Sequence, residues 1–476
     1  MNGHGDPFPD YFNRFREFER QHDVFEVTCG GIPIWERIRI RCFRTVMQES
    51  GVMDKPHTKV DRNSIVNYIK GGYKFLRGLI RRNPFLAPEA DFLFIGGGRR
   101  KPRADGYQWD IFCDPILQSL DLDNVYVEPH YKFSHRRPAK TDPLWYLDAV
   151  TYTSVVQRTL GLASYELTAT EADRLAALER ELAREFDIDI DLQGMVRDAL
   201  SERASRKWLY ERLLNRIDPE IVVIVVSAFK STLIEVCKEH HVPVVEMQHG
   251  GGHHNHLWYT FPDGVDVTTY PDYLFVFGKF WKETVNYPLP DEQVYAVGYP
   301  YLEAERAQYA GLERNQQIIF SSQGSIGEQL SRTAVDFADL DTGYDIVYKL
   351  HPKEYGRWRA EYPWLVDADL TVVDSDTPPL YELLAQSEVN VGVYSTVIYE
   401  GFAFGLDTYL LDAPNVSRMR HLVDRGHVSI VSSAEEIASE LNSKLGEDPV
   451  KTDYFFEPNA VDNILSAFDE IRRREE

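Results

Sequence analysis

The stretch Ile221-Val222-Val223-Ile224-Val225-Val226 decides the fold class, because all six residues are apolar and β-branched. A continuous apolar run of this kind is typical of a parallel strand that helices cover on both faces. A helix over about 230–240 follows, and 242–247 is the next expected strand. Strands that alternate with helices predict βαβ units and a parallel sheet.

The same alternation extends in both directions from this stretch. Expected strands cover 92–95, 273–278, 294–298, 317–320, 344–350, 389–393 and 408–411. The pattern loosens over 299–315, where we place a boundary. The sequence therefore predicts an α/β protein with two Rossmann-like lobes whose parallel sheets face each other across a cleft.

Four segments follow from this pattern. Residues 1–88 form an N-terminal segment that is helical and partly basic and amphipathic, and 89–300 form the first lobe. Residues 301–458 form the second lobe, and 459–476 form a C-terminal helix that could cross back to the first lobe.

Composition narrows the classes of function. The chain has 476 residues and a net charge of −23, which disfavours binding to nucleic acid. Its four cysteines lie far apart without a CxxC pair, which argues against a disulfide framework or a zinc site and suits a reducing cytoplasm. We expect neither a secretory signal nor a membrane span, because no basic-then-apolar start and no long apolar run occur.

Residues 64–86 are basic, and no acidic residue lies between Ser64 and Ala87. Apolar residues recur there at helical spacing, and a second face carries the cations Lys70, Lys74, Arg77 and Arg81. Such a helix could lie on an anionic membrane surface, or it could simply pack on the first lobe.

In doubly wound sheets, ligands bind beyond the carboxyl ends of the strands. Lys349, His351, Pro352 and Lys353 follow one expected strand. The proline fixes the loop backbone, His351 can donate a hydrogen bond to a phosphate oxygen, and a lysine could supply charge. The alternative is a turn with a surface histidine.

Ser395 and Thr396 lie at a strand-to-helix junction. Either residue can cap the helix, and free N–H groups at that terminus could face an anion. Glu400 falls one turn later on the same side as Thr396 and could accept hydrogen bonds from ribose hydroxyls.

A third polar loop, Ser322-Gln323-Gly324, precedes another expected helix. It could hold a phosphate or merely turn the chain. Three such loops at strand ends of one lobe favour phosphate binding over three independent turns.

Four histidines lie within residues 249–256, on a glycine-rich loop. We do not expect a metal site, because adjacent histidines on such a loop rarely converge on one ion and no cysteine or carboxylate cluster completes the set. His249, at a strand end, suits a general base for an acceptor hydroxyl. The alternative is a histidine-rich surface loop.

Asp110 and Asp114 offer a second source for the base. They follow the first expected strand and a basic loop, from which Arg99 and Arg100 could grip an acidic acceptor. Asp114 precedes Pro115, so it could instead be a helix N-cap.

Six short motifs occur in an order that resembles a known group of enzymes. They are QHG (248–250), FG (277–278), VGYP (297–300), SSQG (321–324), KLHP (349–352) and YSTVIYEG (394–401). Over residues 90–470 this order resembles GT-B-type enzymes of surface-polysaccharide assembly. These include capsule glycosyltransferases of the Kdo-transferase kind, bacterial sialyltransferases with HP and S motifs, and CDP-glycerol glycerophosphotransferases.

The resemblance implies roles for the quoted residues. His351 and Pro352 would match the HP motif at the donor phosphates, Ser395 and Thr396 would match the S motif, and Glu400 would contact the ribose. His249 would match the histidine of the HG motif, a base candidate in the glycerophosphotransferases. The chain departs from the sialyltransferase pattern, because its first lobe has no acidic-acidic-glycine motif, and this leaves the sugar and the base open.

The implied function is a GT-B-like glycosyltransferase that needs no metal or other cofactor. It would transfer a sugar, with inversion, from a CMP-, UDP- or GDP-linked donor on the second lobe to a surface polysaccharide or lipid-linked glycan on the first. The alternatives are a CDP-glycerol or CDP-ribitol phosphotransferase, a UDP-sugar 2-epimerase and a non-catalytic binding scaffold. The expected location is the cytoplasm, at the inner face of the membrane if 64–86 bind lipid.

Overall fold

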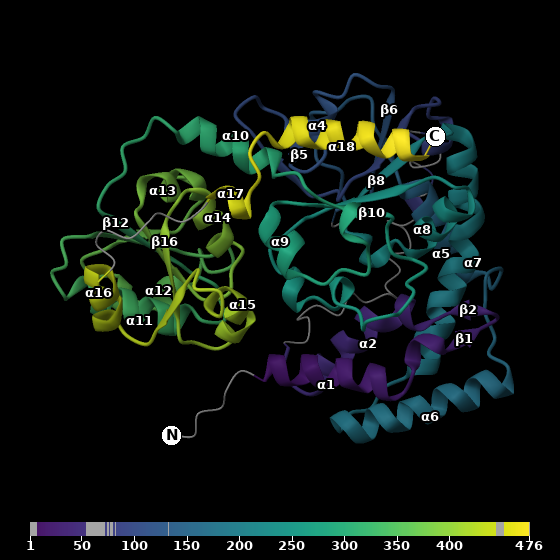
Figure 1. Cartoon of the computed structure of the whole chain (residues 1–476), viewed down its shortest axis with the longest axis horizontal. Coiled ribbons are helices and arrows are strands. Elements are labelled where there is room, and N and C mark those ends of the chain that lie inside the picture. Colours follow the sequence, from purple (N-terminus) through teal and green to yellow (C-terminus); the bar gives the residue numbers. More distant parts are fainter. Residues whose placement is uncertain are drawn as a thin grey trace.

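Two α/β lobes lie side by side in the computed structural model of the chain (Figure 1). The first lobe comprises the described residues before 300 together with the C-terminal helix, and the second lobe comprises the described residues from 310 to 458. Helix α10 (Pro300–Tyr309) joins them. The structure describes residues 7–53, 72, 73, 76, 80, 82–131, 133–443 and 452–475.

A seven-stranded sheet of order β11-β10-β9-β8-β3-β6-β7 forms the centre of the first lobe. All its strand pairs are parallel. The strands are β3 (Phe92–Ile95), β6 (Asn124–Glu128), β7 (Trp145–Tyr146), β8 (Ile221–Val225), β9 (Val244–Met247), β10 (Tyr273–Val276) and β11 (Val294–Ala296). A separate antiparallel hairpin pairs β4 (Arg100–Pro102) with β5 (Gln108–Asp110).

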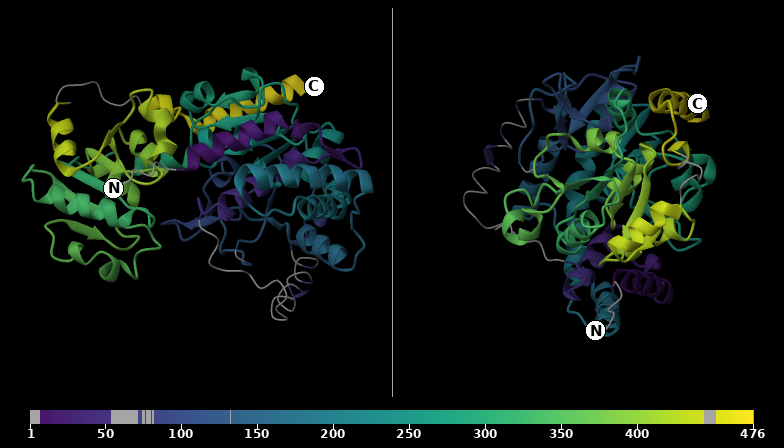
Figure 2. Two further views of the ribbon diagram at one scale, coloured as in Figure 1. Left: turned by 90° about the horizontal axis from the view of Figure 1, so that it is seen from below. Right: turned by 90° about the vertical axis from the view of Figure 1, so that its left-hand side faces the viewer.

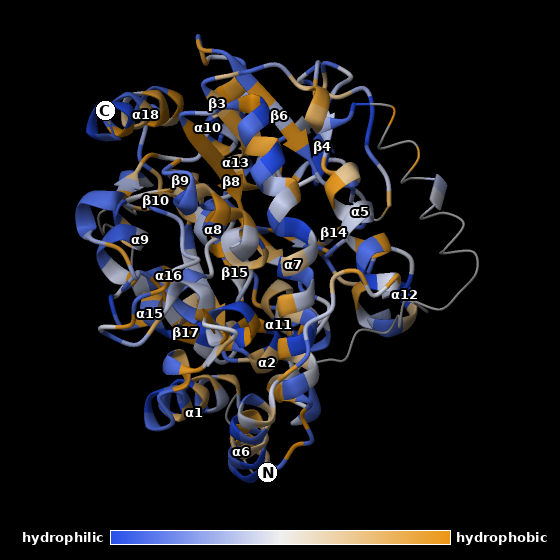
Figure 3. Ribbon diagram, turned by 90° about the vertical axis from the view of Figure 1, so that its right-hand side faces the viewer, coloured by the Kyte–Doolittle hydropathy of each residue, from blue (hydrophilic) through white to orange (hydrophobic). Residues whose placement is uncertain are grey.

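Strand β8 shows why the apolar run predicts a sheet covered on both faces. Ile221 and Val223 pack in one buried cluster with Phe468 of α18 (Ala460–Glu475). Val222 and Ile224 pack in another cluster, which includes residues of α7 (Leu192–Ile217) and α8 (Ser231–Glu239). Figure 3 shows the hydrophobic colouring of β8. The prediction from this run is confirmed.

The charged stretch after residue 168 forms two helices, α6 (Ala169–Phe186) and α7. Thr168 begins α6 with a capping box, in which its hydroxyl accepts the N–H of Glu171 and the Glu171 carboxylate accepts the N–H of Thr168. The described part of the first lobe also contains α4 (Asp114–Leu117), α5 (Asp148–Thr159) and α9 (Lys279–Thr284).

The N-terminal helices α1 (Phe8–Gln21) and α2 (Trp35–Glu49) pack on the first lobe, in a cluster that also holds residues of α6 and α7. Arg39 and Glu19 form a fully buried ion pair at this junction. Helix α1 also packs against η8 (Val416–Met419) of the second lobe, where the Arg418 guanidinium lies 4.1 Å from the centre of the Phe8 ring.

The four cations of the basic segment, Lys70, Lys74, Arg77 and Arg81, lie outside the described residues. Among the helices that are described, none is both long and apolar enough to cross a membrane.

A six-stranded sheet of order β14-β13-β12-β15-β16-β17 forms the second lobe, and all its strand pairs are parallel. The strands are β12 (Gln317–Ser321), β13 (Asp345–Lys349), β14 (Thr371–Val373), β15 (Val389–Gly392), β16 (Asp407–Leu411) and β17 (Ser429–Val431). The two parallel sheets confirm the predicted α/β, GT-B-like class with two Rossmann-like lobes.

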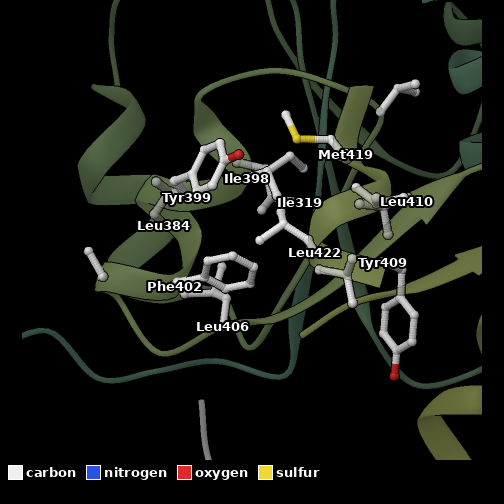
Figure 4. Packing of buried hydrophobic residues seen from close by; sticks show 14 of the residues in the cluster. Ile319, Leu384, Ile398, Tyr399, Phe402, Leu406, Tyr409, Leu410, Met419 and Leu422 are labelled. Atoms are coloured by element: carbon white, nitrogen blue, oxygen red, sulfur yellow. The ribbon is translucent and has the colours of Figure 1, made fainter. Parts of the chain in front are cut away.

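Helix α14 (Val397–Ala403) is buried against the second sheet. Figure 4 shows Ile398 and Phe402 of α14 in the apolar cluster with Ile319 of β12 and Leu410 of β16. The described part of this lobe also contains α11 (Gly327–Ala338), α12 (Trp358–Glu361), α13 (Leu380–Gln386), α15 (Arg420–Val423), α16 (Ala434–Ser443) and α17 (Thr452–Phe455).

After α17 the chain returns to the first lobe, where α18 lies along one side (Figures 1 and 2). The Phe468 ring of α18 lies 5.0 Å from the ring of Phe92 in β3. Glu303 of α10 accepts the N–H groups of Asn459 and Ala460 at 2.8 Å each, just where α18 begins. The C-terminal helix therefore ties the end of the second lobe to the first sheet.

Candidate functional site

A pocket opens between the lobes, with about 360 Å³ of empty volume including its mouth. The first lobe contributes His249, Gly250, Gly251, Phe277, Trp281 and Tyr299, the second lobe contributes Thr396, Tyr399 and Glu400, and Phe456 follows α17. The QHG, FG, VGYP and YSTVIYEG motifs thus meet in one place, although they are up to 150 residues apart in sequence.

Gln248 holds the loop that carries His249. Its side-chain oxygen accepts the Phe277 N–H at 2.7 Å, and its side-chain nitrogen donates to the Gly250 carbonyl at 2.8 Å. The indole N–H of Trp281 donates to the Gly251 carbonyl at 3.0 Å. These contacts fix the loop at the end of β9, so His249 is held on a shaped loop beside the pocket.

His249 is half-buried, and its Nδ1 has no hydrogen-bond partner among the residues that the structure describes. Burial and the nearby charge of Lys230 lower the pKa of His249 to about 4. The imidazole is therefore neutral at neutral pH and able to accept a proton. An anion bound nearby would raise its pKa toward the range that suits a general base.

The other three histidines of the loop make specific contacts. The His253 Nδ1 lies 2.9 Å from the Tyr287 hydroxyl, and the His254 Nε2 lies 2.7 Å from the Thr284 hydroxyl. His256 accepts the Trp258 N–H through Nδ1 at 3.2 Å. Within the described ranges, no three or more His, Cys, Asp or Glu side chains are grouped so that they could hold a metal ion.

The second lobe presents Ser395 and Thr396 at the start of α14. Ser395 accepts the Val397 N–H through its hydroxyl at 3.3 Å, which is a local turn contact. Thr396 is exposed and lines the pocket, and the helix N-cap has no side-chain hydrogen bond. Ser395 therefore shapes the turn, while Thr396 is the residue that reaches the pocket.

Glu400 lies on the next turn of α14 and also lines the pocket. Burial raises its pKa, while the charge of Lys101 and a hydrogen bond with Tyr381 act in the opposite direction. Lys101 belongs to the hairpin of the first lobe, so Glu400 experiences charges from both lobes.

The three polar loops of the second lobe lie side by side, because their strands β13, β12 and β15 are neighbours. Buried Glu354 joins two of them: its carboxylate accepts the His351 N–H at 2.8 Å and the Ser322 hydroxyl at 3.2 Å. Gln323 reaches the third loop, where its side-chain oxygen accepts the Tyr394 N–H at 3.2 Å. The SSQG, KLHP and YST loops therefore form one connected unit.

His351 has a defined tautomer in its neutral form. Its Nδ1 accepts the Lys353 N–H at 3.2 Å, so the ring proton is on Nε2. Burial lowers the pKa of His351, which favours this neutral form. The ring is half-buried and presents an N–H donor, as a phosphate oxygen would require.

Lys349 is used inside the protein. Its ammonium donates to the Tyr355 hydroxyl and to the Ser375 carbonyl, both at 2.6 Å. Burial lowers its pKa. Lys349 is thus held by the neighbouring loop, and its contact with donor phosphates stays a prediction.

Pro352 and Gly324 shape the remaining loops. Pro352 is exposed in the turn after β13. A Cβ atom on Gly324 would lie 3.5 Å from the Arg357 guanidinium, so the Ser322–Gly324 loop passes close to a cation.

Asp110 is 1% exposed and does not line the pocket. Its carboxylate accepts the Tyr126 hydroxyl at 2.7 Å and the N–H groups of Phe112 and Cys113 at 3.0 and 3.2 Å. Asp110 thus holds the turn after β5, and His249 is the base candidate that the structure places at the pocket.

Two expectations around Asp110 are corrected. Arg100 does not face an acceptor, because it is buried in ion pairs with Asp114 at 3.0 Å and Glu128 at 2.7 Å. Asp114 is not the N-cap of α4, because Cys113 is at that position and the Asp114 carboxylate accepts the Asp110 N–H at 2.7 Å.

Sequence reasoning missed Glu354, Tyr399 and the role of Gln248. Glu354 follows His351 by three residues, but a glutamate in a polar loop gives no sign that it is buried. Tyr399 was visible only as part of the YSTVIYEG motif. The glutamine of QHG was the one detectable signal, because it sits directly at a strand end.

No protein-family model matches the sequence, and no curated protein matches it. Solved structures to which the chain is similar include a UDP-GlcNAc 2-epimerase from Methanocaldococcus jannaschii, at 11% identity and TM-score 0.46 over 80% of this chain and 99% of that one. A putative UDP-N-acetylglucosamine 2-epimerase from Listeria monocytogenes gives 12% and 0.46 over 81% and 97%. MurG from Acinetobacter baumannii gives 10% and 0.44 over 80% and 100%.

Proposed function

We propose that the chain is a glycosyltransferase that uses a nucleotide-sugar donor. The observation that carries the proposal is the meeting of His249 from the first lobe with Thr396 and Glu400 from the second lobe in one pocket. The connected unit of polar loops that presents the His351 Nε2–H donor supports it. A hydroxyl and an N–H donor suit the phosphates, and Glu400 suits the ribose hydroxyls.

In the proposed reaction, the His249 imidazole removes the proton of an acceptor hydroxyl. The acceptor oxygen then attacks the anomeric carbon, and the bond from that carbon to the nucleotide phosphate oxygen breaks, leaving its electron pair on the phosphate. His351 and Thr396 stabilise the negative charge that develops there. One displacement with one base gives inversion at the anomeric carbon.

Nucleotide binding is the first test. A nucleotide that binds only the folded protein stabilises it, by about 2.7 kcal/mol at a concentration of 100 Kd. The unfolding temperature rises as a result. We expect a shift with one of UDP, CDP, GDP or CMP, and a smaller shift in His351→Ala. His249→Ala should keep the shift and lose turnover, which separates the donor site from the base. The absence of any shift in the wild type would contradict the proposal.

Product analysis with single donors separates the reaction classes. Release of a nucleotide from a nucleotide-sugar, with a new glycosidic bond on a glycan, supports glycosyl transfer. CMP released from CDP-glycerol or CDP-ribitol, with polyol phosphate on the acceptor, would instead indicate a polyol phosphotransferase. Interconversion of a UDP-sugar without any acceptor would indicate a 2-epimerase, and tight binding without turnover would indicate a scaffold.

Metal independence is part of the proposal. It is supported by the groups among the lining residues that could bind a metal, which are the His249 imidazole, the Glu400 carboxylate and the hydroxyls of Thr396, Tyr299 and Tyr399. We expect full turnover after treatment with EDTA. Activity that is lost with EDTA and restored by Mg²⁺ or Mn²⁺ would overturn this part.

A surface polysaccharide or a lipid-linked glycan remains the proposed acceptor, reached from the cytoplasmic side of the membrane. The motif order and the basic residues of 64–86 support it. Co-sedimentation with vesicles that contain phosphatidylglycerol should fall when Lys70, Lys74, Arg77 and Arg81 are replaced by glutamate. Equal sedimentation of the two proteins would discard the membrane role.

A further inference from the structure

A second pocket lies in the first lobe, where the chain turns from β8 into α8. Its walls come from α2, α7, the 3₁₀ turn Ser227–Phe229 and the first turn of α8. The polar side chains that line it are Arg37, Glu202, Arg206, Tyr210, Lys230, Ser231 and Thr232. None of these residues belongs to the donor site described above.

Two arginines of this pocket have unused donors. Arg37 is 4% exposed and donates through Nη2 to Glu235 at 2.6 Å, while its Nε and Nη1 are buried without a hydrogen-bond partner among the described residues. Arg206 pairs with Glu202 through Nη1, and its buried Nε likewise has no partner. Buried donors without partners are costly, so an oxyanion that accepted from both arginines would be stabilising.

The start of α8 adds donors of the same kind. Lys230 is the N-cap of this nine-residue helix and provides no side-chain cap, and Ser231 and Thr232 of the first turn line the pocket. The first N–H groups of a helix lack intrahelical partners and favour anions. The Lys230 ammonium donates to the carbonyls of Val225 and Val226 at 2.6 and 2.7 Å, which leaves one of its three protons.

The charge at this pocket is positive. Arg37, Arg206 and Lys230 line it, and Glu202 is the one carboxylate among the lining residues. Glu235 does not line the pocket, and its carboxylate accepts hydrogen bonds from both Arg37 and Arg203. The Arg203 Nε donates to it at 2.9 Å. An anionic ligand is therefore favoured over a neutral or cationic one.

The pocket opens at the same edge of the sheet as His249. Strands β8 and β9 are parallel neighbours with Val225 opposite Met247, so the segments after them leave the sheet together. Lys230 lines this pocket, and its charge is one of the causes of the lowered pKa of His249. The Phe229 side chain lies at the rim and is 62% exposed, which offers an aromatic face to a sugar ring.

We propose that this pocket binds an oxyanion of the acceptor, a phosphate or a carboxylate carried on a sugar, between Arg37, Arg206 and the N-terminus of α8. The assignment of the ligand as the acceptor rests on the proposed function. The bound anion would place a neighbouring hydroxyl of the acceptor toward His249. It would also explain why two arginines have buried donor atoms without partners at this position.

The test uses glucose 6-phosphate and glucuronate as probes, with glucose as the neutral control. Each is titrated calorimetrically into the full chain, with and without the nucleotide that the wild type binds. The nucleotide fills the donor site, so a probe that still binds must bind elsewhere. We expect one of the two anions to bind and glucose not to bind. The anion that binds distinguishes a phosphate-bearing acceptor from a carboxylate-bearing one.

Arg37→Gln and Arg206→Gln should each weaken the affinity for the anion at least tenfold. Arg203→Gln is the matched control, because it removes an ion pair with the same Glu235 but does not line the pocket. It should stay within twofold of the wild type. If Arg37→Gln fails to fold, the Arg206→Gln variant alone tests the proposal, because the Arg206 side chain is more exposed.

Binding of neither anion, or binding that is unchanged in Arg206→Gln, overturns the inference. Equal losses in Arg203→Gln and Arg206→Gln also overturn it, because they would reflect a general disturbance of α7. Nucleotide titration of the same proteins keeps the two proposals apart. Nucleotide binding without anion binding contradicts only this inference, and anion binding without nucleotide binding contradicts only the proposed function.

Discussion

The Glu354 carboxylate accepts the backbone N–H of His351 through Oε2 at 2.8 Å, while Oε1 accepts the Ser322 hydroxyl at 3.2 Å. The Tyr362 hydroxyl also donates to Oε1, at 2.8 Å. A carboxylate accepts at both oxygens, so one buried side chain holds two strand-end loops in register. The geometry of the candidate phosphate site therefore depends on a residue that does not line the pocket.

Glu354→Gln should destabilise the protein and weaken nucleotide binding together. The amide replaces one acceptor oxygen with an NH₂ group. This group then faces one of the present donors to Glu354, such as the His351 N–H or the Ser322 hydroxyl, and that donor loses its acceptor. A buried group left in this way costs about 1–3 kcal/mol. Chemical denaturation and nucleotide titration measure the two effects.

Glu361→Gln is the control for Glu354. Glu361 is exposed and pairs with Arg357 one helical turn away, and such surface pairs contribute about 0–1 kcal/mol. Loss of stability in Glu354→Gln with unchanged nucleotide affinity would show that Glu354 supports the fold but does not position the phosphate loops.

His351→Ala should lower turnover by about 10²–10³-fold, the usual effect of removing one donor to a developing negative charge. The side chain is half-buried and not part of the core, so the unfolding temperature should change little. Initial rates of nucleotide release and a thermal scan check both points. Wild-type turnover in this variant would remove His351 from the site.

His351→Gln tests the role of the ring proton. Its amide can present an N–H donor near the position of Nε2, which the fixed tautomer identifies as the donor. Partial recovery of turnover relative to alanine is expected. Equal rates for alanine and glutamine would point to the shape of the ring instead of its donor.

The fold could be predicted from the sequence because its signal is local. Other apolar residues cover each face of β8, and the run from Ile221 to Val226 is apolar at every position because both faces are buried. Short strands such as β7 and β14 escaped prediction, because two or three residues carry no period. Their existence depends on the strands beside them.

The candidate site was harder to predict, because buried charges find partners that are distant in the sequence. Arg100 lies in a stretch of basic residues, which predicts a contact with a ligand, yet its guanidinium forms ion pairs with Asp114 and Glu128. The position of Lys349 near a strand end predicts a contact with phosphate, yet its ammonium donates to the Tyr355 hydroxyl. A sequence shows which residues are charged, but pairing is decided by the tertiary fold.

Gly251→Ala should reduce turnover through the contact between the lobes. A Cβ atom at this position would lie 2.4 Å from Cδ2 of Tyr399, on the opposite wall of the pocket. The lobes must then separate or the ring must move, and misplacement of about 1 Å can cost 10²-fold in rate. Nucleotide affinity should change little, because the polar loops of the second lobe are untouched.

Gly252→Ala is the matched control, since a Cβ atom there meets nothing within 4 Å. It tests whether stiffening of the loop alone reduces the rate. Similar losses in both alanine variants would show that loop flexibility matters more than the approach of Tyr399.

The stability of the contact between the lobes should fall in mild acid. His254 of the first lobe stacks on His421 of the second, with ring centres 3.9 Å apart and planes 8° apart. Burial is the main cause that lowers the pKa of His254 to about 2 and that of His421 to about 4, and the nearby Arg425 lowers both further. Both rings are therefore neutral in the folded protein above pH 4.

The sign follows from proton binding. In the unfolded chain the histidine pKa is about 6.5, so between pH 6.5 and 4 the unfolded state binds more protons than the folded state. Stability is then complete above pH 6.5 and falls as the pH decreases, by up to about 1.4 kcal/mol per pH unit for each histidine. Denaturation at pH 8, 6 and 5 should show this slope.

The double variant His254→Gln/His421→Gln should flatten the slope in part, because other histidines of the loop also have lowered pKa values. Tyr399→Phe is the control: it removes the hydrogen bond to the His421 Nε2 at 2.6 Å but keeps both titrating rings. It should lower stability by a similar amount at pH 8 and pH 5. An unchanged slope in the double variant would show that this stacked pair does not titrate with unfolding.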